Sequence, residues 1–155
     1  MSQSEQIRFS PRAMKSKIAD EIVTKLSEVG DLKYVKFDEV RVNIADFQEH
    51  ELPACQVIDV NETVEHEQNR VKKYWNLTIE VVLKQTTYRL VNQQSLWDLM
   101  YQIERKLFSN PNLGIPGVLH MVYLGNQTDL HLLDPYYIGK FDVQVVYYES
   151  LVRDC

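Results

Sequence analysis

The chain has 155 residues, of which 45% are hydrophobic and 25% are charged, and its formal net charge at pH 7 is -5. These values are typical of one globular domain with a single core, and they exclude the disordered and membrane-spanning classes, because no run approaches the ~18 apolar residues that a spanning helix needs. The negative charge excludes the broad basic face that nucleic-acid-binding proteins present to phosphates, although a local basic patch remains compatible with it.

The first predicted element is a helix that follows Ser10 and Pro11, an N-cap residue and a first-turn proline, and that stops at Gly30. Its apolar positions recur at helical spacing, at Met14, Ile18, Ile22, Leu26 and Val29. Residues 1–9 precede it as a flexible arm. The start of the chain is polar and lacks the apolar stretch of a secretion signal, so we expect a protein that stays in the cytoplasm where it is made.

Three extended segments follow this helix. Residues 34–44 alternate in polarity and predict a strand with a break near Asp38 and Glu39. Pro53 begins a second extended run, because proline is tolerated at the first residue of a strand. The very polar stretch 61–70 then predicts a long, exposed hairpin connection.

Residues 71–84 form the clearest strand, because apolar and polar residues alternate along it. One face of this strand is apolar, formed by Trp75, Leu77, Ile79, Val81 and Leu83. A connector at 86–91 leads to a helix over 92–109, in which Ser95 and Asp98 resemble a capping box. The apolar stripe of that helix contains Leu96, Leu99, Met100, Ile103 and Leu107.

The end of the chain predicts a short strand over 118–124 and a loop over 125–139 that contains a turn at Asp134-Pro135. A final strand over 138–149 places Phe141, Val143, Val145 and Tyr147 on one side. Residues 150–155 are expected to form a C-terminal tail.

Two helices with one apolar stripe each and a sheet with one apolar face have a simple arrangement. We therefore predict an α+β fold, a single domain over residues 1–155, in which two helices pack on one face of a largely antiparallel sheet in the order α-β-β-β-α-β-β. The other face of the sheet is less polar than solvent exposure would predict, since it carries Tyr74, Val82, Val146 and Tyr148. Exposed aromatic residues of this kind often mark an interface.

Motifs that carry chemistry are almost absent from the sequence. It contains no P-loop, dinucleotide-binding glycine fingerprint, nucleophile elbow or zinc-protease helix, so we expect no catalytic, cofactor-binding or metal-binding residues. His120 and His131, which flank one loop, are the best candidates for a metal site assembled in space, but loop histidines are usually solvated. His50 and His66 have no close partner in the sequence, and Cys55 and Cys155 keep neither ligand nor redox spacing.

The acidic residues of the predicted hairpin, Glu62, Glu65 and Glu67, could be paired carboxylates for acid-base catalysis. An exposed hairpin supplies no burial to separate their pKa values, so we interpret them as solvated acids that would repel phosphate. Tyr74 and Trp75 could form a base-stacking platform, but Trp75 belongs to the apolar face and is better interpreted as core.

With this pattern in view, the chain resembles the tail terminator proteins of long-tailed bacteriophages over about residues 18–148. The resemblance is carried by an opening helix that ends at Gly30, the LPA sequence at Leu52–Ala54 leading into Val57, the strand YWNLTIEVVL, the helix LWDLMYQIERKLF with a turn at Asn112 and Gly114, and a last strand ending in VQVVYY. Each piece alone is common in α+β domains, and the match lies in their order and spacing.

The resemblance implies a structural virion protein with no enzymatic activity and no cofactor. Such a protein forms a ring, expected here to be a hexamer, that caps the tail tube and offers a docking surface to the head connector. DNA passes through the ring without specific binding, and no membrane is involved. The implied location is the head-proximal end of the virion tail, after assembly in the host cytoplasm.

The residues that we predict at a subunit or tube interface are Tyr74, Val146, Tyr148, Glu62, Glu65, Glu67 and Arg70. The segment 38–51 is a second candidate contact region. Three alternatives remain open at this point: a head-completion or neck protein of a virion, a non-viral module that binds a peptide or protein on its exposed sheet, and an enzyme built on a histidine and acid cluster.

Overall fold

A computed structural model describes residues 11–85, 91–128 and 135–150. The elements in chain order are α1 (Met14–Ser27), β1 (Tyr34–Phe37), the 3-10 helices η1 (Ile44–Asp46) and η2 (Glu49–Glu51), β2 (Ala54–His66), β3 (Arg70–Lys84), α2 (Gln93–Leu107), β4 (Val118–Thr128) and β5 (Tyr136–Ser150). The predictions for the N-terminal arm, Ser10, the connector 86–90, His131, Asp134 and the residues after 150 lie outside the described residues.

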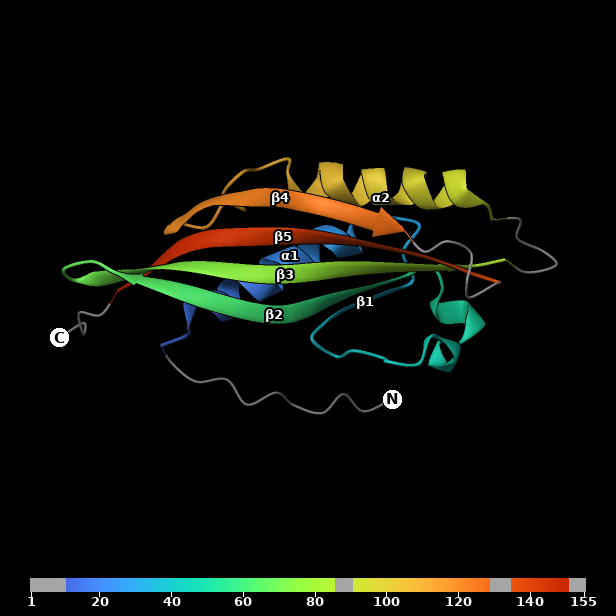
Figure 1. Ribbon diagram of the computed structural model, residues 1–155, viewed down its shortest axis with the longest axis horizontal. Helices are drawn as coiled ribbons and strands as arrows, with labels where there is room; N and C mark the ends of the chain where they lie inside the picture. The colour runs from blue at the N-terminus through green and yellow to red at the C-terminus, as the bar shows by residue number, and fades with distance from the viewer. Residues whose placement is uncertain (1–10, 86–90, 129–134, 151–155) are drawn as a thin grey trace.

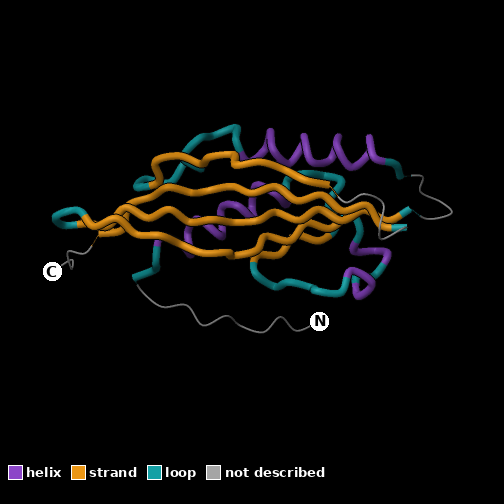
Figure 2. Tube along the Cα trace, viewed as in Figure 1, coloured by secondary structure: helices purple, strands orange, loops and turns teal. Residues whose placement is uncertain are grey.

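The sheet has five strands in the order β1-β2-β3-β5-β4 (Figure 1). β2, β3, β5 and β4 pair antiparallel, whereas β1 runs parallel to the start of β2, so the sheet is mixed and the prediction of a largely antiparallel sheet is confirmed. Figure 2 shows the long β2, β3, β4 and β5 side by side, with α1 behind them and α2 beside β4. The predicted order of elements differs in detail, because two short 3-10 helices lie between β1 and β2.

Both helices lie against the same face of the sheet, as the two apolar stripes predicted. One buried cluster joins α1, the inner side of β3 and β5, and α2. Among its members are Ile18, Ile22 and Leu26 from α1, Trp75, Leu77 and Ile79 from β3, Leu96, Ile103 and Leu107 from α2, and Phe141, Val143 and Tyr147 from β5. Lys106 of α2 also pairs with Glu28 just after α1, so the two helices are joined at their ends as well. We call this side of the sheet the helix face and the opposite side the outer face.

The start of α1 was predicted wrongly. The helix begins at Met14, three residues beyond the predicted proline start, and its N-cap residue Ala13 has no side chain that could cap it. The amide of Met14 instead donates to the Glu149 carboxylate at 3.2 Å, which is a partner 135 positions away in the chain. A carboxylate from β5 therefore replaces the local N-cap, because it satisfies one of the free amide groups of the first turn and favours the positive end of the helix dipole.

The start of α2 agrees with the predicted range 92–109, but its capping box lies three residues earlier than the predicted one. Asn92 is the N-cap, its side chain accepts from the amide of Ser95 at 2.9 Å, and the Ser95 hydroxyl accepts from the amide of Asn92. Ser95 therefore closes the capping box instead of beginning it, and the predicted pairing of Ser95 with Asp98 is wrong.

The polar stretch 61–70 was predicted as a loop, yet most of it is strand. β2 continues to His66 and β3 begins at Arg70. Cross-strand partners stabilise these polar residues, because Asn76 donates to Asn61 at 2.7 Å and Tyr74 donates to Glu65 at 3.1 Å. The hairpin is polar because the end of β2 and the first residue of β3 are exposed to solvent. The loop that joins the two strands is only residues 67–69.

Residues 38–53 form a cover over one end of the outer face. The predicted break near Asp38 and Glu39 is present, but the structure has no strand after it in this segment. β1 ends at Phe37 and Asp38 turns the chain with φ 56°. The segment buries a second apolar cluster against β2, β3 and β5, made of Phe47, Leu52, Ala54, Val82 and Ile138. The outer-face residue Val82 is consequently buried, not exposed as predicted.

The Gln56 side chain anchors this cover. It accepts from the amide of Arg41 at 2.8 Å and donates to the carbonyl of Arg41 at 3.3 Å and to the Glu80 carboxylate at 2.7 Å. Arg41 in turn lies against the rings of Tyr34 and Phe47, which meet edge to face, with its guanidinium carbon 4.7 Å and 5.0 Å from their centroids. A buried amide and a stacked cation thus hold the segment on the sheet.

Both last strands are longer than predicted. β4 continues to Thr128 and β5 starts at Tyr136, so a large part of the predicted loop 125–139 belongs to the sheet. The pairing register of β4 with β5 shifts twice, at Leu119 and at Leu124. The sequence did not predict a strand over 125–128 because Gly125, Asn126, Gln127 and Thr128 show no alternation of apolar and polar residues.

Candidate interaction surface

The predicted interface residues lie around the β2-β3 hairpin and the adjoining end of β5. Tyr74 pairs in register with Val146 and Lys72 pairs with Tyr148, so the two tyrosines occupy neighbouring positions on the outer face. Both tyrosine side chains are partly buried. The structure therefore brings Tyr74 and Tyr148 together as the alternation of the strands predicted.

Charged residues of the hairpin contact these aromatic rings. The Glu65 carboxylate accepts from the Tyr74 hydroxyl at 3.1 Å, and Arg70 Nε donates to Glu67 at 2.7 Å. The Arg70 guanidinium lies 3.6 Å from the centroid of the Tyr148 ring, a cation-π contact, and its hydrogen bond to Glu67 raises the pKa of Arg70. We call these residues, Glu65, Glu67, Arg70, Tyr74 and Tyr148, the hairpin patch. Aromatic residues with an arginine and a polar rim are the composition that binding surfaces favour.

Val146 and Glu62 lie apart from the hairpin patch. Val146 is on the outer face but only 1% exposed, so it supports the surface from below. Glu62 points to the helix face, because a bulge at Val60 reverses the alternation of β2 beyond Asp59. The assignment of both residues to an interface stays a prediction, and neither presents a free side chain in the single chain.

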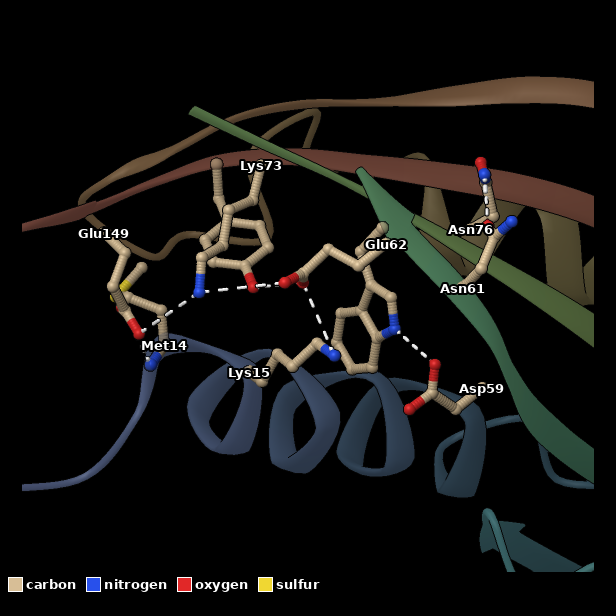
Figure 3. Close-up of polar contacts among 10 residues, drawn as sticks. Met14, Lys15, Asp59, Asn61, Glu62, Lys73, Asn76 and Glu149 are labelled. Atoms are coloured by element: carbon tan, nitrogen blue, oxygen red, sulfur yellow. Dashed lines mark hydrogen bonds and ion pairs between the residues drawn. The ribbon is translucent and has the colours of Figure 1, made fainter. Parts of the chain in front are cut away.

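Glu62 is the centre of an ion cluster that fastens the start of α1 to the sheet (Figure 3). Its carboxylate accepts from the Tyr147 hydroxyl at 2.6 Å and lies 3.4 Å from Lys15 Nζ and 3.7 Å from Lys73 Nζ. Lys73 also lies 4.0 Å from Glu149, whose other oxygen binds the Met14 amide. The cluster joins α1, β2, β3 and β5, and its contacts hold these four elements together.

Burial raises the pKa of Tyr147, and the hydrogen bond to Glu62 raises it further. Tyr147 is fully buried as a residue, and its phenol therefore stays protonated and donates to the carboxylate. A phenol held in this state is a hydrogen-bond donor.

Trp75 is core, as the sequence predicted, and the residue is only 1% exposed. The indole Nε1 donates to Asp59 at 2.8 Å and Lys15 Nζ lies 4.8 Å from the ring centroid. The base-stacking interpretation of Trp75 is therefore wrong, because nucleotide bases would need the buried face of the ring.

A row of polar side chains crosses the middle of the outer face. Gln144 donates to Asn76 at 3.1 Å, Asn76 donates to Asn61 at 2.7 Å, and Thr78 donates to Asp142 at 2.7 Å. Each side chain in this row meets a partner on the next strand, so the row stiffens the open part of the sheet between the hairpin patch and the cover formed by residues 38–53.

A pocket of about 430 Å³ opens on the other side of the molecule, beside α2. Its lining residues are Asp31, Lys33, Pro53, Leu83, Val91, Ser95, Asp98, Leu99 and Gln102. Within the described residues, no group of three or more His, Cys, Asp or Glu side chains converges as a metal site would require. His50, His66 and His120 are exposed, and the fourth histidine lies outside the described residues.

Sequence reasoning missed the exposed apolar residues at the lateral edges of the sheet. Trp97 and Tyr101 on α2 are 54% and 57% exposed, and Leu124 on β4 is 53% exposed. The signal for the first two was present, since they are four residues apart on the polar side of the helix. Leu124 gave no such signal, because its orientation depends on a bulge.

Comparison with known proteins yields a likeness of fold. No protein family model matches the chain, and no curated protein matches it. Among solved structures, the chain is similar to one from the virion of a native gene transfer agent (GTA) particle, with a TM-score of 0.59, 9% sequence identity, and coverage of 88% of this chain and 98% of that chain. At this identity the two chains share a fold. No helix among the described residues is both long and apolar enough to cross a membrane.

Proposed function

We propose that this chain is a structural protein of a phage-like virion, and specifically a ring-forming tail terminator. The observation that carries the proposal is the likeness of fold to a chain of a GTA virion, which extends over 98% of that chain. The independent resemblance of the sequence to tail terminators points in the same direction, because the elements that carry it occur in the structure in the same order.

The role needs a rigid scaffold with exposed contact surfaces. Long central strands, a row of cross-strand hydrogen bonds and the ion cluster at Glu62 supply the rigidity. The hairpin patch supplies a polar and aromatic surface at one end of the sheet, where we place the contact with the tail tube protein. The opposite end, beside the cover formed by residues 38–53, is left for the head connector.

The proposal includes the absence of catalytic activity and of a bound cofactor. The strongest polar clusters, around Glu62 and around Gln56 and Glu80, join elements of the chain to one another. A net charge of -5 suits a ring through which DNA passes without specific binding, because like charge repels phosphate.

The experiment is removal of the gene from cells that make the particle, followed by electron microscopy of the products. We expect filled heads that carry no tails, together with tails of uncontrolled length, and both defects should be reversed by supplying the chain. Normal joined particles in the deletion strain would refute the proposal. A purified chain that turns over a substrate or retains a cofactor would refute its non-catalytic part.

The second candidate, a head-completion or neck protein, differs in one outcome of this experiment. Loss of such a protein should leave tails of normal length that fail to join. A non-viral binding module would leave the particles unaffected, so the same images separate all three functions.

A further inference from the structure

The large hydrophobic side chains that the described residues expose form two groups, one at each lateral edge of the sheet. The first group, which we call the aliphatic edge, is Val40, Val42, Val60 and Val64, on β2 and the segment after β1. The second group, the aromatic edge, is Trp97, Tyr101, Leu119, Tyr123 and Leu124, on α2 and β4. The order of the strands places β1 and β2 at one side of the sheet and β4 at the other.

Every irregularity in the antiparallel pairing of the sheet contributes to one of these edges. The register shifts between Asp59 and Asn61 in β2, and the extra residue is Val60, which is 54% exposed. The two shifts in β4 leave Leu119 and Leu124 as extra residues, 39% and 53% exposed. A bulge redirects a side chain, and each of these redirects an aliphatic one into solvent.

The aromatic edge is continuous from helix to strand. Trp97 and Tyr101 are one turn apart on α2, and Arg105 follows one turn later with its guanidinium 5.8 Å from the Tyr101 ring. Glu104 of the same turn accepts from the hydroxyl of Tyr123 on β4 at 2.7 Å. Figure 1 shows α2 lying along β4 at this margin of the molecule.

The aliphatic edge begins where β1 stops pairing with β2. That pairing ends at Val57, and beyond it β2 runs along the margin of the sheet with Val60 and Val64 exposed. Val42, in the segment that leaves β1, is 90% exposed. Exposed acidic residues, Asp38, Glu39 and Asp59, flank these valines.

Both edges are shaped against the addition of another strand. The amide of Asp59 donates to the Asp38 carboxylate at 3.4 Å, and the amide of Met121 on β4 donates to the carbonyl of Pro111 at 3.0 Å. Bulges and occupied amides of this kind hinder edge-to-edge pairing. A contact at these edges therefore has to be made by side chains, which are the groups that the bulges turn outward.

We propose that copies of this chain join head to tail, with the aromatic edge of one copy packed on the aliphatic edge of the next. The occupant is a second copy because the two edges complement each other: large aromatic side chains and Arg105 on one, small aliphatic side chains and acids on the other. About half of Trp97 and of Tyr101 is exposed, which is on the order of 100 Å² each. With the three residues of β4, they supply the apolar centre of an interface of standard size, ~800 Å² per partner.

Different patches in contact make the interface heterologous, so the assembly is a closed ring or an open filament. The closure of this contact into a ring rests on the proposed function. The head-to-tail contact itself does not depend on it. This contact also leaves the hairpin patch free for a different protein.

The test uses two variants that each lose one edge. The aromatic-edge variant carries Trp97→Glu and Tyr101→Glu, and the aliphatic-edge variant carries Val60→Glu and Val64→Glu. Matched controls place glutamate at exposed neighbours that belong to neither edge, Gln102→Glu on α2 and Thr63→Glu on β2. Light scattering behind a size-exclusion column measures the mass at up to ~1 mM, and circular dichroism checks folding.

We expect the wild type and both controls to exceed the mass of a dimer, and each edge variant alone to be monomeric. Mixing the two edge variants should give a species with the mass of two chains and no larger one, because only one intact pair of edges remains between them. If the glutamate variants do not fold, serine at the same positions replaces them, with the same expectations.

Three outcomes would overturn the inference: a monomeric wild type at ~1 mM, an edge variant that assembles like the wild type, or an aliphatic-edge variant that forms dimers by itself. The last would mean that the aromatic edge contacts its own copy. These outcomes leave the proposed function standing if the deletion strain shows unjoined tails. Conversely, normal particles in the deletion strain would refute the proposed function and leave the head-to-tail contact intact.

Discussion

Removing the hydrogen bond between Tyr147 and Glu62 should destabilise the fold by an amount that can be worked from its geometry. The Tyr147 hydroxyl is in a fully buried residue and donates at 2.6 Å to a carboxylate whose side chain is 16% exposed. Hydrogen bonds to charged groups contribute about 1.5–3 kcal/mol. We therefore expect Tyr147→Phe to lower the free energy of unfolding by that amount.

The partner change, Glu62→Ala, leaves the buried Tyr147 hydroxyl without its acceptor and releases Lys15 and Lys73. An unsatisfied buried group costs about 1–3 kcal/mol, whereas the ion pairs with the partly exposed lysines add at most about 1 kcal/mol each. The double variant should lose less than the sum of the two single variants, with a coupling energy of about 1.5–3 kcal/mol.

Urea unfolding followed by circular dichroism measures these free energies, at one protein concentration because assembly would change apparent stability. In a chain of this size, the Tyr147→Phe loss corresponds to a decrease in Tm of about 3–12 °C. Thr78→Val, which removes a hydroxyl bond on the outer face, is a control for general loss of a side-chain hydrogen bond. A coupling energy below about 0.5 kcal/mol would refute the view that Glu62 ties β5 to the hairpin.

The same bond predicts a dependence of stability on pH. The pKa of Tyr147 is raised above its ordinary value of 10.0, so the folded state holds this proton more tightly than the unfolded state. The contribution is fully present below pH 10 and is lost as the pH rises beyond it. The wild type should therefore lose stability above that pH more steeply than Tyr147→Phe does. Equal slopes would contradict the raised pKa.

Three further predictions concern other parts of the molecule. Arg41→Gln should speed hydrogen exchange within residues 38–53 while the central strands keep their protection, and unchanged exchange would show that the stacked guanidinium does not hold the cover. Gly139→Val should lower the free energy of unfolding by about 1–3 kcal/mol, because the valine side chain would collide with Met100. Adding Met100→Ala should relieve part of this loss. If the losses of the two single variants simply add in the double variant, the collision is excluded. Burial raises the pKa of the Cys55 thiol to about 12, so a thiol reagent at pH 8 should modify it only after unfolding, as measured in a chain whose other cysteine is serine.

The sequence predicted correctly on which side of the sheet the two tyrosines lie, but it placed one acidic residue on the wrong side. Tyr74 and Tyr148 lie together on the outer face, as the alternation of β3 and β5 required. Glu62 was assigned to the same surface, but the bulge at Val60 turns it to the helix face. A bulge depends on pairing with another strand, so a pattern within one strand could not reveal it.

Local periodicity determined which side of each element is buried. The period of two in β3 and β5 and the helical spacing in α1 and α2 selected the residues of the core, because side-chain direction follows from backbone geometry alone. The α+β class and the position of both helices on one face followed from those stripes.

Tertiary structure decided the features that depend on partners distant in the chain. The start of α1 is set by Glu149, the length of the β2-β3 hairpin by cross-strand pairs, and the burial of Val82 by the cover of residues 38–53. The exposure of Val60, Leu119 and Leu124 likewise arises from bulges in paired strands. Each of these features is stabilised by contacts between segments that are distant in the sequence. Such contacts exist only once the chain has folded.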